Sequence, residues 1–129
     1  MRPFTVAAAV LIALGAAVPA HAAQGVPEPS RGLFLTVSGS DNTWIRGVLL
    51  RCTPEPAGHH PQAAQACAAI EEAAGDFDAL AGDPHACTKE FDPVTASATG
   101  TYEGRVIGWQ KTYPNACAMD AATGYVFRF

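Results

Sequence analysis

Lys89 is the residue of this chain with the clearest chemical use. Lys89 lies in the stretch 83–92, with Pro84 before it and Pro93 after it in the sequence. Each proline fixes its own φ angle and biases the preceding residue toward extended backbone. A trypsin-like serine protease accepts such a stiff, extended segment when it displays a basic side chain, because an acid in the protease's primary pocket pairs with the base. The Lys89-Glu90 bond is therefore a candidate scissile bond. A lysine in a polar loop is also commonly a solvated charge, and the residues alone leave that reading open.

Side chains for a catalytic or metal site are present, but no supporting motif accompanies them. After residue 22, histidines stand at positions 59, 60 and 85, and serines at 30, 38, 40 and 97. The sequence has no Gly-x-Ser-x-Gly turn and no His-Glu-x-x-His helix. The adjacent His59 and His60 lie in a loop with Pro and Gly, where neighbouring histidines rarely converge on one ion. We therefore predict that the protein is not an enzyme and that it uses no metal and no cofactor.

The four cysteines are even in number, and none are spaced as a Cys-x-x-Cys pair; they are Cys52, Cys67, Cys87 and Cys117. This spacing disfavours zinc-ribbon and thioredoxin-like sites. In an exported chain it predicts two disulfides, with the pairing left open by the sequence.

The N-terminus predicts export. Residues 1–22 have a basic start at Arg2, an apolar run and the small-x-small pattern Ala20-His21-Ala22, which is typical of a secretory signal peptide. Its removal would take one of eight basic residues and none of the twelve acidic ones. We predict a secreted, extracellular and mildly acidic protein without general affinity for nucleic acid or for membranes.

The rest of the chain predicts one α+β domain over residues 33–129, preceded by a flexible arm over 23–32. Runs of β-forming residues predict strands over 33–37, 44–52, 94–100, 102–113 and 124–129, with turn residues between the first two. Residues 62–74 predict the main helix, and short helical turns are expected near 76–80 and 118–122. The expected fold is about five antiparallel strands with one main helix and one or two short ones on a face. Phe34 and Trp44 are expected in the core.

The run Cys87-Thr88-Lys89-Glu90-Phe91-Asp92-Pro93-Val94 resembles the reactive-site segment of the Streptomyces subtilisin inhibitor family. In that segment a cysteine, the scissile bond, an aromatic residue and Asp-Pro-Val follow in this order. The run Tyr113-Pro114-Asn115-Ala116-Cys117 is similar to the family's aromatic-x-Asn-x-Cys motif. Matching features extend over nearly all of the chain after residue 22.

The resemblance implies the same α+β fold and a role for each part of the loop. It implies the reactive-site residues Lys89 and Glu90, the contact residues Cys87, Thr88, Phe91 and Asp92, and loop support from Pro93 and Asn115. It also selects the disulfides Cys52-Cys67 and Cys87-Cys117, and it implies a homodimer paired through its sheets. The expected partners are trypsin-like and, as second targets, subtilisin-like serine proteases.

Glu90 departs from the apolar residue that is common at this place in the family, so the breadth of inhibition is left open. Two further readings of the function remain: a secreted binding module that inhibits nothing, and a slow substrate or regulator of the producer's own protease.

Overall fold

In the computed structural model of this protein, residues 32–129 and the isolated positions 3, 15 and 17 are described. The predicted signal peptide over 1–22 and arm over 23–32 thus lie almost wholly outside the described residues. The elements in chain order are β1 (Leu33–Ser38), the 3-10 helix η2 (Ser40–Asn42), β2 (Ile45–Arg51), β3 (Ala57–Gly58), α1 (Ala63–Glu72), η3 (Phe77–Ala79), β4 (Val94–Tyr102), β5 (Arg105–Tyr113), α2 (Ala116–Thr123) and η4 (Gly124–Phe127). No helix within the described residues is both long and apolar enough to cross a membrane.

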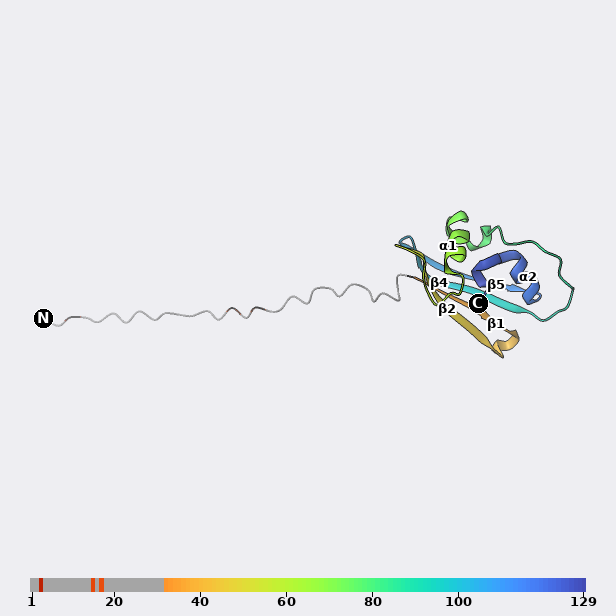
Figure 1. The fold of residues 1–129 in the computed structure, drawn as a ribbon. Helices are drawn as coiled ribbons and strands as arrows, with labels where there is room; N and C mark the ends of the chain where they lie inside the picture. Colours follow the sequence, from red (N-terminus) through yellow and green to blue (C-terminus); the bar gives the residue numbers. More distant parts are fainter. Residues whose placement is uncertain (1–2, 4–14, 16, 18–31) are drawn as a thin grey trace.

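One antiparallel sheet carries the domain, and its five strands follow the order β3-β2-β1-β4-β5. The helices cover one face of this sheet (Figure 1). The α+β class, the antiparallel sheet, the main helix and the two disulfides are confirmed. The turn between β1 and β2 has Asp41 and Asn42 at positive φ, in the cluster of turn residues that the sequence places between these strands. The turn between β4 and β5 has Glu103 and Gly104 at positive φ, so the predicted start of a strand at residue 102 is wrong.

Alternation along the strands divides the sheet into a covered and an open face. Leu33, Leu35 and Val37 of β1 are buried under the helices, together with Ala96 and Ala98 of the neighbouring β4. The small alanines leave room for α2, and η4 packs over β1. The hydrophobic core therefore lies between the sheet and one layer of helices.

The expectation that Phe34 and Trp44 are core residues is wrong. Phe34 alternates onto the open face and is 45% exposed, while Trp44 precedes β2 and is 41% exposed. A Cβ on Gly39 would come within 2.3 Å of the Trp44 indole nitrogen, so this ring lies flat on the turn of the first hairpin. Both residues favour strands, but their type does not tell which face of the sheet is covered.

Helix α1 is shorter than the predicted 62–74 and ends in a tight turn at Ala74 and Gly75. The Gly75 amide donates to the Ile70 carbonyl and the Ala74 amide to the Glu71 carbonyl, both at 2.9 Å. This pairing, with both residues at positive φ, is a Schellman turn. The Cys52–Cys67 disulfide ties the helix to the chain just after β2.

The predicted strand over 124–129 is wrong, because the chain forms the 3-10 helix η4 at Gly124–Phe127 instead. Val126 and Phe127 are adjacent and both buried, whereas a strand would place them on opposite faces. His60 fixes this segment, since its Nε2 lies 3.0 Å from the Val126 carbonyl oxygen. The fifth strand is the short β3, in a segment rich in Pro and Gly that gave no strand signal. Helix α2 covers Ala116–Thr123 and exceeds the expected turn over 118–122.

Candidate functional site: an exposed loop held by the second helix

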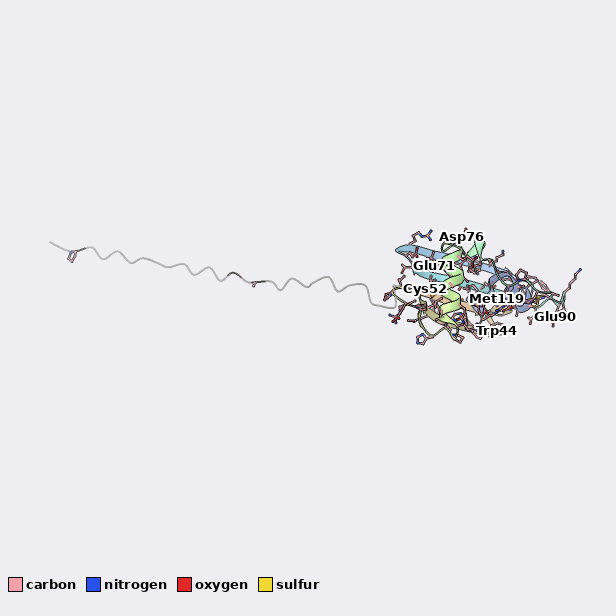
Figure 2. All side chains as sticks on the ribbon, turned by 45° about the horizontal axis from the view of Figure 1, so that its top comes forward. Trp44, Cys52, Glu71, Asp76, Glu90 and Met119 are labelled. Atoms are coloured by element: carbon pink, nitrogen blue, oxygen red, sulfur yellow. A yellow bond between two sulfur atoms is a disulfide. The ribbon has the colours of Figure 1, made fainter. Side chains whose placement is uncertain are left out.

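The loop between η3 and β4 contains Lys89. Over residues 81–93 it has no helix or strand, and every residue from 83 to 92 is exposed. The loop swings around one end of the domain in Figure 1, and Figure 2 shows Glu90 at its outer tip. The candidate site is thus a protruding segment and not a cavity, which suits recognition by another protein's cleft.

Asn115 supports the centre of this loop with both ends of its side chain. Its Nδ2 donates to the carbonyl oxygen of Thr88 at 3.2 Å and to that of Glu90 at 2.7 Å. Its Oδ1 accepts a 2.8 Å hydrogen bond from the Ala118 amide and caps α2. These partners leave one orientation of the amide, so the cap fixes the donor against the loop. Asn115 is only 8% exposed although the loop itself is exposed.

Two further connections hold the loop on either side of that contact. The Cys87–Cys117 disulfide joins the limb before Lys89 to the first turn of α2, with the Cα atoms 5.8 Å apart. On the other side the Asp92 amide donates to the Pro114 carbonyl at 2.9 Å. Both disulfides have the pairing that the resemblance implies. The loop is therefore attached to the segment 114–117 at both limbs and at its centre.

Lys89 lies between the two carbonyls that Asn115 holds. Among the described residues the Lys89 and Glu90 side chains contact no ion-pair or hydrogen-bond partner. Phe91 is 80% exposed and packs on nothing in the core. Three adjacent side chains, one cationic, one anionic and one aromatic, are thus presented outward from a backbone that is fixed from behind.

A charged cluster that the sequence analysis did not identify lies at the base of the same loop. Arg128 donates from Nε to Asp120 Oδ1 at 2.6 Å, and from Nη2 to Asp120 Oδ2 at 2.9 Å and to Asp83 Oδ2 at 2.8 Å. His85 Nε2 lies 2.8 Å from Asp120 Oδ2. No sequence signal would have found this cluster, because its members lie up to 45 positions apart and share no motif.

The cluster shifts the pKa values of its members. Hydrogen bonds from Arg128, and then from His85, hold the pKa of Asp120 below its ordinary value, against an opposing effect of desolvation. The hydrogen bond to Asp120 raises the pKa of His85 above its ordinary value. Asp120 is therefore a carboxylate at neutral pH, and His85 is more readily protonated than a free histidine.

The arrangement of His85, Cys87 and Cys117 resembles a metal-ligand set, since their ligand atoms lie within 4.8 Å of one another. The two sulfurs are bonded to each other and so cannot act as thiolate ligands. His60 is also engaged at both ring nitrogens, because Nδ1 accepts from the Gln62 amide at 2.9 Å while Nε2 contacts the Val126 carbonyl.

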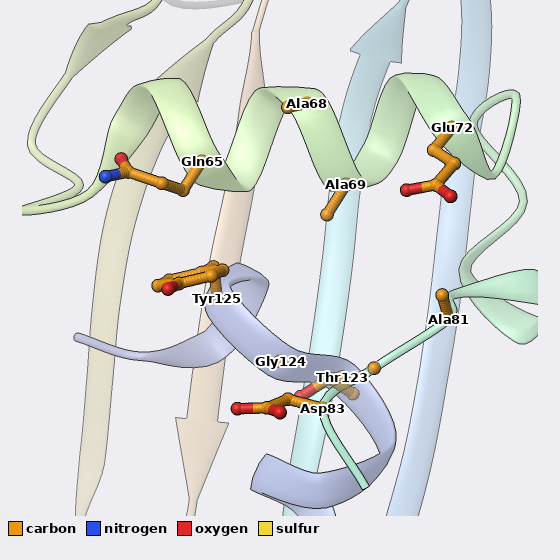
Figure 3. Close-up of a pocket in the computed structure, with 10 residues that line it drawn as sticks. Gln65, Ala68, Ala69, Glu72, Ala81, Asp83, Thr123, Gly124 and Tyr125 are labelled. Atoms are coloured by element: carbon orange, nitrogen blue, oxygen red, sulfur yellow. The ribbon is translucent and has the colours of Figure 1, made fainter.

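A groove of about 400 Å³ lies beside the limb of the loop that precedes Cys87 (Figure 3). Helix α1 forms one wall through Gln65 and Glu72, and Asp83 and Tyr125 lie opposite. The groove does not include Lys89, so the loop tip and the groove are separate features.

A family model described as subtilisin inhibitor-like matches residues 29–115, which include the whole loop and Asn115. The chain belongs to the subtilisin inhibitor-like family. This is a family of protease inhibitors and not of enzymes.

Relatives within the family match along most of their length. The chain is 39% identical over 126 residues to the subtilisin inhibitor of Streptomyces violaceus, covering 92% of this chain and 86% of that one. It is 37% identical over 116 residues to a subtilase-type protease inhibitor of Streptomyces fradiae, covering 85% and 82%. The structure is similar, with a TM-score of 0.64 and 34% identity, to Streptomyces caespitosus sermetstatin solved in complex with Bacillus licheniformis subtilisin; the match covers 76% of this chain and 97% of that one.

Proposed function

We propose that this protein inhibits serine proteases of the trypsin-like and subtilisin-like kinds by presenting Lys89-Glu90 as a substrate-like bond. One observation carries the proposal: Asn115 holds the carbonyls of Thr88 and Glu90 from inside the domain, while Lys89 between them has no partner among the described residues. A loop fixed in this way loses little conformational entropy when it enters a protease cleft.

The same rigidity explains how a cleavable bond can inhibit. The protease serine attacks the Lys89 carbonyl carbon, the bond to the Glu90 nitrogen breaks, and the protease histidine supplies the proton that the new amine takes. The Cys87–Cys117 disulfide and the Asn115 contact to Thr88 hold the acyl side, and the Glu90 and Asp92 contacts hold the amine side. The amine then stays beside the acyl-enzyme and competes with water at high effective concentration, so religation outpaces hydrolysis.

Lys89 and Glu90 set the target range in this proposal. A lysine side chain suits the acidic primary pocket of trypsin-like enzymes. The structural similarity to sermetstatin, which was solved with a subtilisin, supports subtilisin-like enzymes as second targets. The Glu90 carboxylate favours proteases with positive charge beside the scissile bond and weakens binding to the rest.

The setting of the inhibitor is part of the proposal. We infer that residues 1–22 direct export and are removed, which places the domain outside the cell, where its two disulfides persist. We also infer a homodimer paired through the open sheet face, because Phe34, Ile45 and Val106 expose apolar surface there. Pairing on that face would leave the loop of each subunit free.

The test is a titration of active-site-calibrated trypsin and subtilisin with the oxidised protein lacking residues 1–22, followed by mass spectrometry of the inhibitor. Stoichiometric loss of activity with slow, single-site cleavage at Lys89-Glu90 is expected. Rapid cleavage without loss of activity would show that the loop is not held rigidly and would contradict the proposal. Slow cleavage without inhibition would indicate a slow-substrate or regulatory role, and neither cleavage nor inhibition would indicate a binding module.

A further inference from the structure

Residues 82–87 form the limb of the loop that precedes Lys89, and this limb contacts the end of α2. The Asp83 amide donates to the Ala121 carbonyl at 3.0 Å. A Cβ on Gly82 would come within 2.4 Å of the same carbonyl oxygen, so only glycine at this position, with its φ of 68°, allows the approach. The limb has no strand to pair with, whereas the limb after Lys89 runs directly into β4.

Arg128 connects this limb to α2 through side chains. Its guanidinium binds both oxygens of Asp120 in α2 and reaches Asp83 in the limb with Nη2. The Cζ atom also lies 4.9 Å from the centre of the Tyr125 ring, which restricts the arginine further. A planar guanidinium fixed at three carboxylate oxygens and a ring has little freedom, so it holds Asp83 at a defined place.

His85 makes a second connection between the limb and Asp120, at 2.8 Å. Asp120 is therefore shared by two basic side chains, Arg128 from the C-terminal segment and His85 from the limb, and the second is a cation when it is protonated. Side chains of the limb are fixed at positions 83 and 85, and the disulfide follows at 87. A single covalent attachment at Cys87 would leave the limb free to rotate about it, and the two ion pairs prevent this.

We propose that Arg128, Asp120 and His85 are positioning residues that keep the acyl side of the Lys89-Glu90 bond in place for religation. The inference rests on the proposed inhibitory function and adds a second support to that of Asn115. The acyl half of a cleaved inhibitor is the half that this limb carries. When the limb moves, the Lys89 acyl carbon leaves the amine, and hydrolysis gains on religation.

The His85 connection depends on pH. The groups that face His85 are the Asp120 carboxylate of α2, the Asp83 carboxylate of its own limb and, through Asp120, the Arg128 guanidinium; the nearby sulfurs do not titrate. Because Asp120 raises the pKa of His85, the charged pair is complete below the ordinary value of 6.5 and is lost as the pH rises through the raised value. The limb is accordingly best fixed in mildly acidic solution.

Three variants and one control test the proposal. Arg128→Ala removes both ion pairs of the guanidinium, His85→Ala removes the histidine pair, and His85→Gln keeps a neutral donor near the place of Nε2. Arg46→Ala is the matched control: Arg46 lies over the Trp44 ring at the same 4.9 Å and, within the described residues, binds no carboxylate.

The measurements are the inhibition constant against subtilisin and trypsin, the rate of Lys89-Glu90 hydrolysis in the complex, and the melting temperature of each variant. We expect Arg128→Ala to hydrolyse about tenfold faster and His85→Ala about three- to fivefold faster than the parent, with Arg46→Ala unchanged. The advantage of the parent over His85→Gln should be present at about pH 6, below the ordinary pKa of 6.5, and decline as the pH rises through the raised pKa of His85. A variant that lowers only the melting temperature, or a ratio of parent to His85→Gln that does not change with pH, overturns the proposal.

Failure of the proposed function is distinguishable from failure of this inference. If the parent inhibits neither protease, the proposed function fails, and hydrogen exchange of the free protein then tests the limb by itself. Faster exchange at the amides of residues 85–88 in Arg128→Ala than in Arg46→Ala supports the positioning role. Equal exchange in the two variants overturns it.

Discussion

The Asn115 side-chain amide nitrogen lies 2.7 Å from the Glu90 carbonyl oxygen, and the same side chain caps α2 through its oxygen. Asn115 is therefore both the cap of α2 and the support of the loop. Any change that rotates this amide affects the start of α2 and the centre of the loop together, and a suitable pair of substitutions can separate the two effects.

Asn115→Asp should weaken inhibition while keeping much of the helix cap. Aspartate retains the oxygen that accepts from Ala118 but replaces the Nδ2 donor with an acceptor that faces the Thr88 and Glu90 carbonyls. Asn115→Ala loses both functions and about 1 kcal/mol of cap energy. We expect both variants to raise the inhibition constant at least about tenfold, and Asn115→Ala to melt lower. Inhibition by Asn115→Asp as tight as that of the parent would show that the Nδ2 contacts do not matter.

The two disulfides should separate inhibition from stability. Replacing Cys52 and Cys67 by serine opens a 15-residue loop and costs about 3 kcal/mol of unfolding free energy, but leaves the reactive loop attached. Replacing Cys87 and Cys117 has a similar cost of about 3.5 kcal/mol and also frees the limb before Lys89. Denaturant unfolding should rank the two double variants close together. Only the Cys87/Cys117 variant should be cleaved rapidly at Lys89-Glu90, and equal cleavage of both would contradict this.

Lys89→Ala should abolish inhibition of trypsin and spare part of the inhibition of subtilisin. A buried side chain in the primary pocket is the expected hot spot of the complex, so trypsin binding should fall by at least about 100-fold. Subtilisin should lose less, because main-chain pairing of the loop supplies much of that binding. Lys111→Ala on β5 serves as the control, since Lys111 lies 5.4 Å over the Tyr113 ring and outside the loop. Unchanged trypsin inhibition by Lys89→Ala would show that the scissile bond lies elsewhere.

Much of the fold was predictable because local signals agreed with it. Turn residues separated β1 from β2, and Ala-rich sequence after Pro61 marked α1, whereas the turn between β4 and β5 at Glu103 and Gly104 lies inside the strand predicted over 102–113. The strand predicted over 124–129 is wrong because Tyr125, Val126 and Phe127 favour strands by residue type. In the fold, aromatic contacts of Phe127 with Phe77 and Trp109 hold the segment in η4. Such contacts depend on three-dimensional proximity and leave no local pattern.

Only the residues of the candidate site that belong to a sequence motif could be predicted. Two sequence motifs predicted the loop and its central support: the run from Cys87 to Val94 and the motif around Asn115. Asp83, His85, Asp120 and Arg128 come from three separate segments and meet only because Gly82 lets the limb approach α2. Their charges look like ordinary surface charges in the sequence, and only the tertiary fold brings them together.

Glu90→Leu should broaden the target range. Removing the carboxylate beside the scissile bond takes away the cost of burying a charge in a cleft that offers it no partner. We expect the inhibition constant against subtilisin to fall about three- to tenfold, and its dependence on salt to weaken. Measurements at two ionic strengths check both effects. Tighter subtilisin binding by the parent than by Glu90→Leu would mean that the protease offers Glu90 a cation.

If the protein forms the proposed dimer, Phe34→Arg should convert it into a monomer with a working loop. Phe34 lies on β1, the central strand of the sheet, on the face that no helix covers. A Cβ on Gly47 would come within 2.9 Å of its ring, so the ring covers this glycine of β2 and still leaves apolar surface exposed. Burying an arginine between two sheets without a partner opposes pairing.

Sedimentation equilibrium should give twice the chain mass for the parent and the single mass for Phe34→Arg. Val106→Arg, at the end of the edge strand β5, should perturb pairing less than Phe34→Arg. A monomeric parent would exclude the open face as a dimer interface, and a dimeric Phe34→Arg would place the interface elsewhere.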